Sequence, residues 1–327
     1  MSEPTRVLIV DDSRIFRSVL EQALRAEGAD VVGSVWNGAK ALEFIEASPP
    51  HLVTLDVEMP GMNGLEVLRA IQHFNAARPG AAPVGVLMVS AFTRQGADVT
   101  IQALEAGAFD FITKPSTNSE EESLRLLRQQ LAVKLRSFQA RRSSPLSPVL
   151  GAEGAGVRGE SGVIRPRPRL QGPPIKLVLI ASSTGGPRAL SILLPDLCRR
   201  IDLPILIVQH LAAPFTQSLA ASLDRQCGHT VIEAMEGDTV RPGTVYIAPG
   251  GKHLLLRGGA GKVITALNEQ PPENGCRPAA DVLFRSAAAV PDAAAVAVVL
   301  TGMMSDGTRG LRPLGDSRDI TPGGSRC

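Results

Sequence analysis

The chain has 327 residues, of which 44% are apolar and 20% charged, and its formal net charge is +2. At roughly 150 residues per domain, this length predicts two domains, and the composition excludes wholesale disorder. The near-neutral charge and the 3% of aromatic residues argue against a nucleic-acid partner. Because no apolar run reaches the roughly 18 residues of a membrane span, we expect no membrane insertion.

Cysteine usage and the N-terminus bear on the compartment. The cysteines Cys198, Cys227, Cys276 and Cys327 show neither C-x-x-C spacing nor clustering, which disfavours a disulfide framework or a structural zinc site. The N-terminal sequence runs straight into an expected strand without a signal-peptide pattern. We therefore expect a cytoplasmic protein.

The first part of the chain alternates short β-rich runs with amphipathic helical stretches. Strands are predicted at 6–10, 30–35, 52–56, 84–89 and 110–113, and a long final helix from about 119 to 142. Such a βα repeat predicts an α/β fold of the flavodoxin-like type, with a parallel sheet and helices on both faces. Ligands of such sheets gather at the carboxyl ends of the strands.

Polar residues stand at these strand ends. Asp11 and Asp12 follow the first strand, Asp56 ends the third, Ser90 follows the fourth and Lys114 follows the fifth. Three carboxylates at one sheet edge need a counter-ion, and hard oxygen ligands suit Mg²⁺. A lysine and a hydroxyl opposite them would neutralise and orient a phosphoryl group. Helix capping and a surface lysine explain any one of these residues, but not all of them together.

Residues 4–125 resemble a response-regulator receiver domain through the motifs VDDSR, TLDVEMPGMNG, VSAFT and FITKP. The resemblance implies that Asp56 accepts a phosphoryl group from a partner histidine kinase. It implies that Asp11, Asp12, Asp56 and the backbone carbonyl of Glu58 hold Mg²⁺.

The same resemblance assigns three further positions. Lys114 would pair with the phosphoryl group, Ser90 would swing to hydrogen-bond it, and Phe111 would occupy the aromatic switch position.

A linker follows the long helix. Between positions 143 and 174, 12 of 32 residues are Gly or Pro, and no apolar periodicity runs through them. This composition is typical of a flexible tether.

The second part of the chain also reads as α/β, but mixed. A strand, turn and helix begin near 177, a second strand covers 204–210, and short antiparallel strands are expected around VYIAPGGKHLLL. RPAADVLFRSAAAV is expected to form a helix, and AAAVAVVLTGMMSDG a buried strand that ends in a loop.

The turn IASSTGGP at 180–187 places serines between an apolar strand and a helix N-terminus. Free amides there favour a developing oxyanion, so the turn is a candidate nucleophile site, although a helix N-cap or a phosphate-binding turn remain alternatives. His210 at the end of a neighbouring strand is the best candidate base, whereas His229 and His253 are expected at the surface. Asp306 is the candidate acid, or else a plain turn residue.

These residues lie within motifs that resemble the catalytic domain of chemotaxis protein-glutamate methylesterases. The motifs are ASSTGGP, LIVQHLAAPFT, VYIAPGGKHLLL, NGCRPAADVLFRSAA and LTGMMSDG. By this resemblance Ser183 is the nucleophile, His210 the general base and Asp306 the orienting acid. Thr184 and the backbone amide of Met303 would lie beside the oxyanion. Ser182 falls where the family usually has alanine, which favours Ser183.

The resemblance implies a function and its control. The protein would hydrolyse glutamyl methyl esters, and deamidate glutamines, on methyl-accepting chemotaxis receptors, with no cofactor for the esterase step. A chemotaxis histidine kinase would be the phosphodonor. The unphosphorylated receiver would cover the active-site face until Asp56 is phosphorylated. The expected domains are a receiver at 1–125, a helix extension and linker at 126–174, and a catalytic domain at 175–327.

The last residues support an alternative function. Residues 311–327 lack a periodic apolar pattern and are rich in Gly, Pro and charge, which we interpret as a truncated or frame-shifted end. Losing a neighbouring strand would expose the strand that leads to Asp306. The alternative is therefore a phosphorylation-controlled binding protein whose catalytic domain is inactive.

Overall fold

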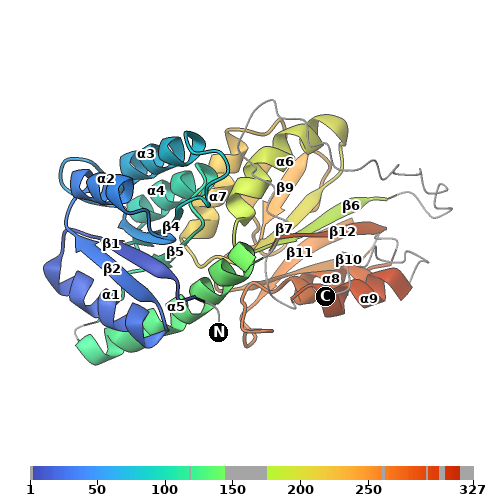
Figure 1. Ribbon diagram of the computed structural model, residues 1–327. Coiled ribbons are helices and arrows are strands. Elements are labelled where there is room, and N and C mark those ends of the chain that lie inside the picture. The colour runs from blue at the N-terminus through green and yellow to red at the C-terminus, as the bar shows by residue number, and fades with distance from the viewer. Residues whose placement is uncertain are drawn as a thin grey trace.

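The computed structural model describes residues 3–117, 119–143, 175–259, 262–291, 294–301 and 306–316. Residues 144–174 of the predicted linker at 143–174, and most of the atypical stretch 311–327, lie outside the described residues. The two parts of the chain on either side of the linker each form a layered α/β structure (Figure 1).

In the first part, strands and helices alternate as the apolar pattern predicts. The elements are β1 (Arg6–Val10), α1 (Arg14–Ala26), β2 (Asp30–Val35), α2 (Gly38–Ala47), β3 (Leu52–Asp56), α3 (Gly64–Ala76), β4 (Gly85–Ser90), α4 (Arg94–Glu105), β5 (Asp110–Thr113) and α5 (Glu120–Ser143). Only the fourth strand is displaced from its predicted range, by one residue. Helix starts are fixed by side-chain caps, and at α3 Asn63 and Glu66 form a reciprocal capping box.

The strands of this part form a parallel sheet in the order β2-β1-β3-β4-β5. Helices α1 and α5 pack on one face, and α2, α3 and α4 pack on the other. This arrangement brings the carboxyl ends of β1, β3 and β5 to one edge of the sheet.

The second part contains a parallel sheet and a separate hairpin. Its elements are β6 (Leu177–Ser182), α6 (Gly186–Arg200), β7 (Ile205–Gln209), α7 (Phe215–Asp224), β8 (Thr230–Glu233), β9 (Thr244–Ile247), β10 (His253–Gly259), β11 (Lys262–Asn268), α8 (Ala280–Ala289), β12 (Ala295–Thr301) and α9 (Thr308–Asp316). The sheet order is β12-β6-β7-β9-β8, with every pair parallel. The antiparallel pair β10–β11 gives this part its mixed character.

Two expectations for this part differ from the structure. The segment VYIA was expected in an antiparallel pair, but β9 lies inside the parallel sheet between β7 and β8. The strand after position 294 was expected to be buried, but β12 is an edge strand among the described strands and Val299 is 44% exposed. A continuous apolar run signals a strand, but it does not distinguish the centre of a sheet from its edge.

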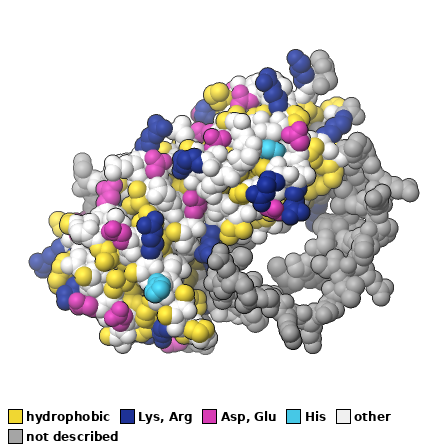
Figure 2. Space-filling view, turned by 90° about the horizontal axis from the view of Figure 1, so that it is seen from above, with side chains coloured by type: hydrophobic (Ala, Val, Ile, Leu, Met, Phe, Trp, Pro, Cys, Tyr) yellow, Lys and Arg dark blue, Asp and Glu magenta, His cyan; other side chains and the backbone are white. Residues whose placement is uncertain are grey.

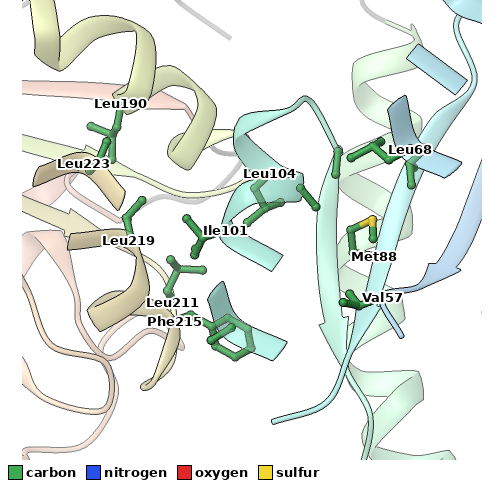
Figure 3. Packing of buried hydrophobic residues seen from close by; sticks show 14 of the residues in the cluster. Val57, Leu68, Met88, Ile101, Leu104, Leu190, Leu211, Phe215, Leu219 and Leu223 are labelled. Carbon is green, nitrogen blue, oxygen red and sulfur yellow. The ribbon is translucent and has the colours of Figure 1, made fainter. Parts of the chain in front are cut away.

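The two parts share one apolar core at their junction. Val57, Leu68, Met88, Ile101 and Leu104 belong to the first part and continue into a cluster from α6, α7 and the loop before α7 (Figure 3). On that side Phe215 is fully buried, and its ring centroid lies 4.5 Å from that of Phe111 and 6.0 Å from that of Phe92. Helix α4 therefore packs directly against α6 and α7.

Polar contacts frame this junction. Ser222 Oγ on α7 and Gln226 Nε2, two residues after that helix, donate to the carboxylate of Glu105 at 3.0 and 3.2 Å. Figure 2 shows acidic and basic side chains interspersed over one face of the molecule, as the near-neutral composition predicts. Among the described residues, no helix is both long and apolar enough to cross a membrane.

Candidate active and phosphoryl-acceptor sites

Asp11, Asp56 and Lys114 meet at the carboxyl edge of the first sheet. Lys114 Nζ lies 2.8 Å from Asp11 Oδ2 and 2.7 Å from Asp56 Oδ2, and both carboxylates are buried. Asp56 ends β3, and its backbone carbonyl lies so close to Gly64 that a Cβ there would come within 2.1 Å of it. Parallel strand order thus brings together residues that are far apart in the sequence.

This cluster holds more carboxylates than cationic side chains. Burial raises the pKa of Asp56 to about 6, although the ammonium of Lys114 opposes the shift. The two carboxylates in turn raise the pKa of Lys114, against the effect of its own burial. One lysine therefore compensates only part of the negative charge.

The donor set fits a hard divalent cation. Carboxylate oxygens of Asp11, Asp12 and Asp56 lie within 4.8 Å of one another, and Asp12 is exposed to solvent. Oxygen ligands of this kind suit Mg²⁺. The exposed Glu58 follows in the adjacent loop, where its backbone amide donates to Asp56 Oδ1 at 3.3 Å.

Ser90 and Phe111 make their contacts with α4 and α7. Ser90 is fully buried, and its Oγ lies 3.2 Å from the carbonyl of Gly96 and accepts a hydrogen bond from Thr100 Oγ1 at 2.8 Å. Phe111 is half-buried against Phe215 in the second part of the chain. The two positions that the receiver resemblance assigns to switching thus contact α4 and α7.

In the second part, the serine turn lies at the carboxyl end of β6. Ser182 is buried and donates to Gln209 Oε1 at 2.6 Å, whereas the next residue, Ser183, is only half-buried. Gln209 Nε2 donates in turn to the carbonyl of Ser183 at 2.9 Å. A Cβ on Gly186 would come within 1.8 Å of Gln209 Oε1, so a side chain at this first position of α6 would displace the Gln209 amide from the serine turn.

His210 follows the neighbouring strand in register with this turn. Ser182 pairs with Gln209 across β6 and β7, and the amide of His210 donates to the carbonyl of Ser182 at 3.1 Å. Ser183 and His210 therefore lie next to each other in the backbone. His210 Nε2 lies 2.7 Å from Asp306 Oδ2, and the other ring nitrogen, Nδ1, is buried without a hydrogen-bond partner among the described residues.

Asp306 is held by the N-terminus of α8. The amide of Ala280 donates to Oδ2 at 2.7 Å, and the amides of Asp281 and Gly307 donate to Oδ1 at 3.0 and 3.1 Å. Burial alone would raise the pKa of Asp306, but His210 and the amides of Ala280 and Asp281 outweigh it and lower the pKa. The carboxylate is therefore ionised and fixed in place.

His210 is correspondingly basic. Burial lowers its pKa, but the contacts with Asp306 and with the side chain of Cys276 outweigh burial and raise the pKa to about 9. An imidazole that is paired with a buried carboxylate and lies beside a serine turn is suited to act as a general base.

Of the two residues expected beside the oxyanion, the structure describes only Thr184. Thr184 Oγ1 donates to Asp110 Oδ2 in β5 at 2.5 Å, and the same carboxylate oxygen accepts from Lys134 at 2.7 Å. Met303 lies outside the described residues. The hydroxyl of Thr184, the residue after Ser183, is thus hydrogen-bonded to the first part of the chain.

Several residues that contact this site lie within the quoted motifs but were given no role there. Gln209 bridges the serine turn, and Asn274 and Cys276 approach Asp306 and His210 from the loop before α8. Gln209 could have been found as a polar residue at the end of an apolar strand, directly before His210. His253 was expected at the surface but is buried, where its Nδ1 accepts from the amide of Ala279 at 3.2 Å.

Comparisons with known proteins cover both parts of the chain. Residues 7–124 match the response regulator receiver domain family and residues 178–322 match the CheB methylesterase family. A "Protein-glutamate methylesterase/protein-glutamine glutaminase" of Nocardioides sp. is 42% identical over 94% of this chain and 82% of its own length. The protein of the same name from Desulfotalea psychrophila is 40% identical over 94% of this chain and 85% of its own length.

A solved structure, the CheB methylesterase catalytic domain of Thermotoga maritima, is 44% identical, covers 44% of this chain and 76% of that chain, and has a TM-score of 0.42. The assignment rests on the relatives that span almost the whole chain. The chain belongs to the protein-glutamate methylesterase/protein-glutamine glutaminase family and carries a response regulator receiver domain.

Proposed function

We propose that the protein hydrolyses glutamyl methyl esters, and deamidates glutamines, on methyl-accepting chemotaxis receptors, with Ser183, His210 and Asp306 as its catalytic triad. The observation that carries this proposal is the 2.7 Å contact between His210 and Asp306 beside the half-buried Ser183. The family's activity supplies the reaction, and this arrangement supplies the groups that the reaction needs.

The reaction proceeds through an acyl-enzyme. His210 Nδ1 takes the proton of Ser183 as Oγ attacks the ester carbonyl carbon, and amides at the N-terminus of α6 stabilise the oxyanion. The carbon–methoxy bond then breaks, and His210 returns the proton to methanol. Water, activated by the same imidazole, releases the glutamate side chain. A glutamine reacts in the same way and releases ammonia.

This mechanism makes activity depend on pH. His210 acts as a base only when it is neutral, and its pKa is raised to about 9. We therefore expect kcat/KM to increase as the pH rises from neutrality through about 9, because the neutral fraction of His210 grows over that range. Methanol release measured across this pH range checks it. A profile that is flat from neutral pH upward would contradict the role given to His210.

The receiver supplies control, with Asp56 as phosphoryl acceptor and a chemotaxis histidine kinase as phosphodonor. Asp11, Asp12 and Asp56, with the backbone carbonyl of Glu58, would hold Mg²⁺, which neutralises phosphoryl oxygens when bound. Lys114 pairs with the phosphoryl group. The Ser90 hydroxyl leaves its contacts on α4 and hydrogen-bonds the phosphoryl group. Phe111, the switch residue, follows this movement.

Contacts across the junction support this control. The hydrogen bond from Thr184 to Asp110 ties the residue next to Ser183 to β5, and Phe111 packs on Phe215 at the start of α7. Because both contacts are made by the first two residues of β5, a movement of this strand is transmitted to the loops that carry Ser183 and His210. In the unphosphorylated state the receiver covers the active-site face.

Replacing Asp56 with alanine is expected to leave basal activity in place and to abolish stimulation by a small phosphodonor, because the acceptor carboxylate is gone. Asp30→Ala, which removes an exposed carboxylate of the same domain, serves as the matched control and keeps the stimulation. The measurement is methanol release with and without phosphodonor. Equal stimulation of Asp56→Ala and the wild type would rule out control through Asp56.

The function itself is tested with methyl-labelled receptor membranes. Methanol release by the purified full-length protein supports the esterase, and no release by a demonstrably folded protein would favour the binding-protein alternative.

This proposal divides the chain into three regions. They are a receiver domain at 1–125, a helix extension and linker at 126–174, and the catalytic domain at 175–327.

A further inference from the structure

A tight turn between β11 and α8 lies against the proposed triad. Glu273 and Cys276 exchange two backbone hydrogen bonds, of 3.0 and 2.9 Å, around Asn274 and Gly275. Both central residues have positive φ, 52° for Asn274 and 77° for Gly275, as a type I′ turn requires. Asn274 is the one described residue other than glycine with a positive φ.

Helix α8 anchors this turn at two points. Arg285 donates to both carboxylate oxygens of Glu273 at 2.6 Å, and the Asn274 amide donates to Asp281 Oδ2 at 2.9 Å. Asp281 is fully buried, and its other oxygen accepts from the amide of Gly310 in α9 at 2.6 Å. The carboxylate of Asp281 thus joins the turn to the segment that follows Asp306.

The Asn274 amide also reaches the triad. Its Nδ2 lies 3.3 Å from Asp306 Oδ1 as well as 2.9 Å from Asp281 Oδ2, so its two N–H groups serve two buried carboxylates. Because Asp306 Oδ2 faces His210, the contact at Oδ1 acts on the opposite side of the same carboxylate. A neutral donor at this point separates two like charges without adding a third.

We propose that Asn274 is a positioning residue for the reaction, which fixes the Asp306 carboxylate so that His210 is held in its working orientation. This inference rests on the function proposed above. It assigns a role to the NG pair of the NGCRP motif, which none of the triad residues explains.

The turn and the hydrogen-bond donor can be separated by substitution. Asp-Gly suits a type I′ turn about as well as Asn-Gly, and glycine adopts positive φ without strain. Asn274→Asp and Asn274→Gly therefore both preserve the backbone of the turn. Both remove the amide donor, and Asn274→Asp also adds a carboxylate beside Asp281 and Asp306.

The experiment measures kcat and KM for methanol release from methyl-labelled receptor membranes, with phosphodonor present. Asn274→Gly is expected to lower kcat by roughly tenfold to a hundredfold with KM unchanged, since the lost contact lies behind the triad and not on the substrate. Asn274→Asp, the closer match in shape, is expected to lose about a hundredfold or more, because like charges repel there. Circular dichroism and thermal unfolding confirm that the variants are folded.

Controls separate the possible failures. Asn268→Asp, on β11 of the same hairpin, changes an amide whose Oδ1 accepts from Gln270, and it is expected to keep wild-type kcat. Ser183→Ala is run in parallel. If Ser183→Ala is inactive while both Asn274 variants keep wild-type kcat, the positioning role is wrong and the triad stands. If Ser183→Ala keeps activity, the proposed function fails, whatever the Asn274 variants do.

Discussion

Ser183→Ala is expected to lower kcat for methanol release by about a millionfold, because the attacking oxygen is lost and only the oxyanion amides and substrate binding still accelerate the reaction. Ser182→Ala is the matched control. Ser182 is buried and bonded to Gln209, so its removal is expected to cause only a modest loss through a looser turn. Both variants are measured on the same methyl-labelled receptor membranes.

The neighbouring serines make this comparison decisive. Ser183 is the more exposed of the two serines. Ser182 pairs with Gln209 across β6 and β7, so the next residues, Ser183 and His210, follow these paired positions side by side. If Ser182→Ala were the inactive variant and Ser183→Ala the active one, the nucleophile would have to be reassigned to a buried hydroxyl whose hydrogen bond is already satisfied by Gln209.

Asp306→Asn is expected to lower kcat by roughly ten-thousandfold while the fold is retained. An asparagine has nearly the shape of the aspartate, but its amide cannot hold the His210 tautomer and does not stabilise the imidazolium. The raised pKa of His210 depends on the Asp306 carboxylate, so the remaining activity should reach its plateau at a lower pH than in the wild type. Rates measured across the same pH range as for the wild type check both effects.

Asp202→Asn, which changes an exposed carboxylate of the same domain, controls for nonspecific effects of charge. If Asp306→Asn kept wild-type kcat, Asp306 would be a turn residue, the alternative that the S-D-G sequence leaves open. The contacts of Asp306 with three backbone amides and with His210 argue for the larger effect.

Much of the fold and both candidate sites could be predicted because parallel strands place their carboxyl ends at one edge. Asp11, Asp56 and Lys114 were predicted to meet for this reason, and the structure brings Lys114 Nζ within 2.8 Å of both carboxylates. The pairing of His210 with Asp306 follows the same rule, because their strands flank β6 on either side in the sheet order.

Contacts that depend on packing between the two parts could not be predicted. Apolar periodicity shows that α4 and α7 have buried faces, but not that these faces bury each other. The bond from Thr184 to Asp110 joins residues of two separate sheets across the linker. A local pattern carries no information about how two folded units dock.

The loop before α8 illustrates a different limit. The letters NG indicate a turn, but the two carboxylates that Asn274 contacts come from α8 and from the loop after β12. His253 was misplaced for a similar reason, because a hairpin strand is half-buried only when another element covers it. Here α8 packs over β10 and covers His253.

Trapping the acyl-enzyme tests the central claim most directly. The full-length protein is mixed with methyl-labelled receptor membranes and phosphodonor, quenched in acid during turnover, and analysed by mass spectrometry for a covalent link to the receptor glutamate. We predict a link through Ser183 in the wild type, more of it when phosphodonor is present, and none in Ser183→Ala. A link through Ser182 or Cys276, or methanol release from Ser183→Ala at the wild-type rate, would contradict the proposed triad.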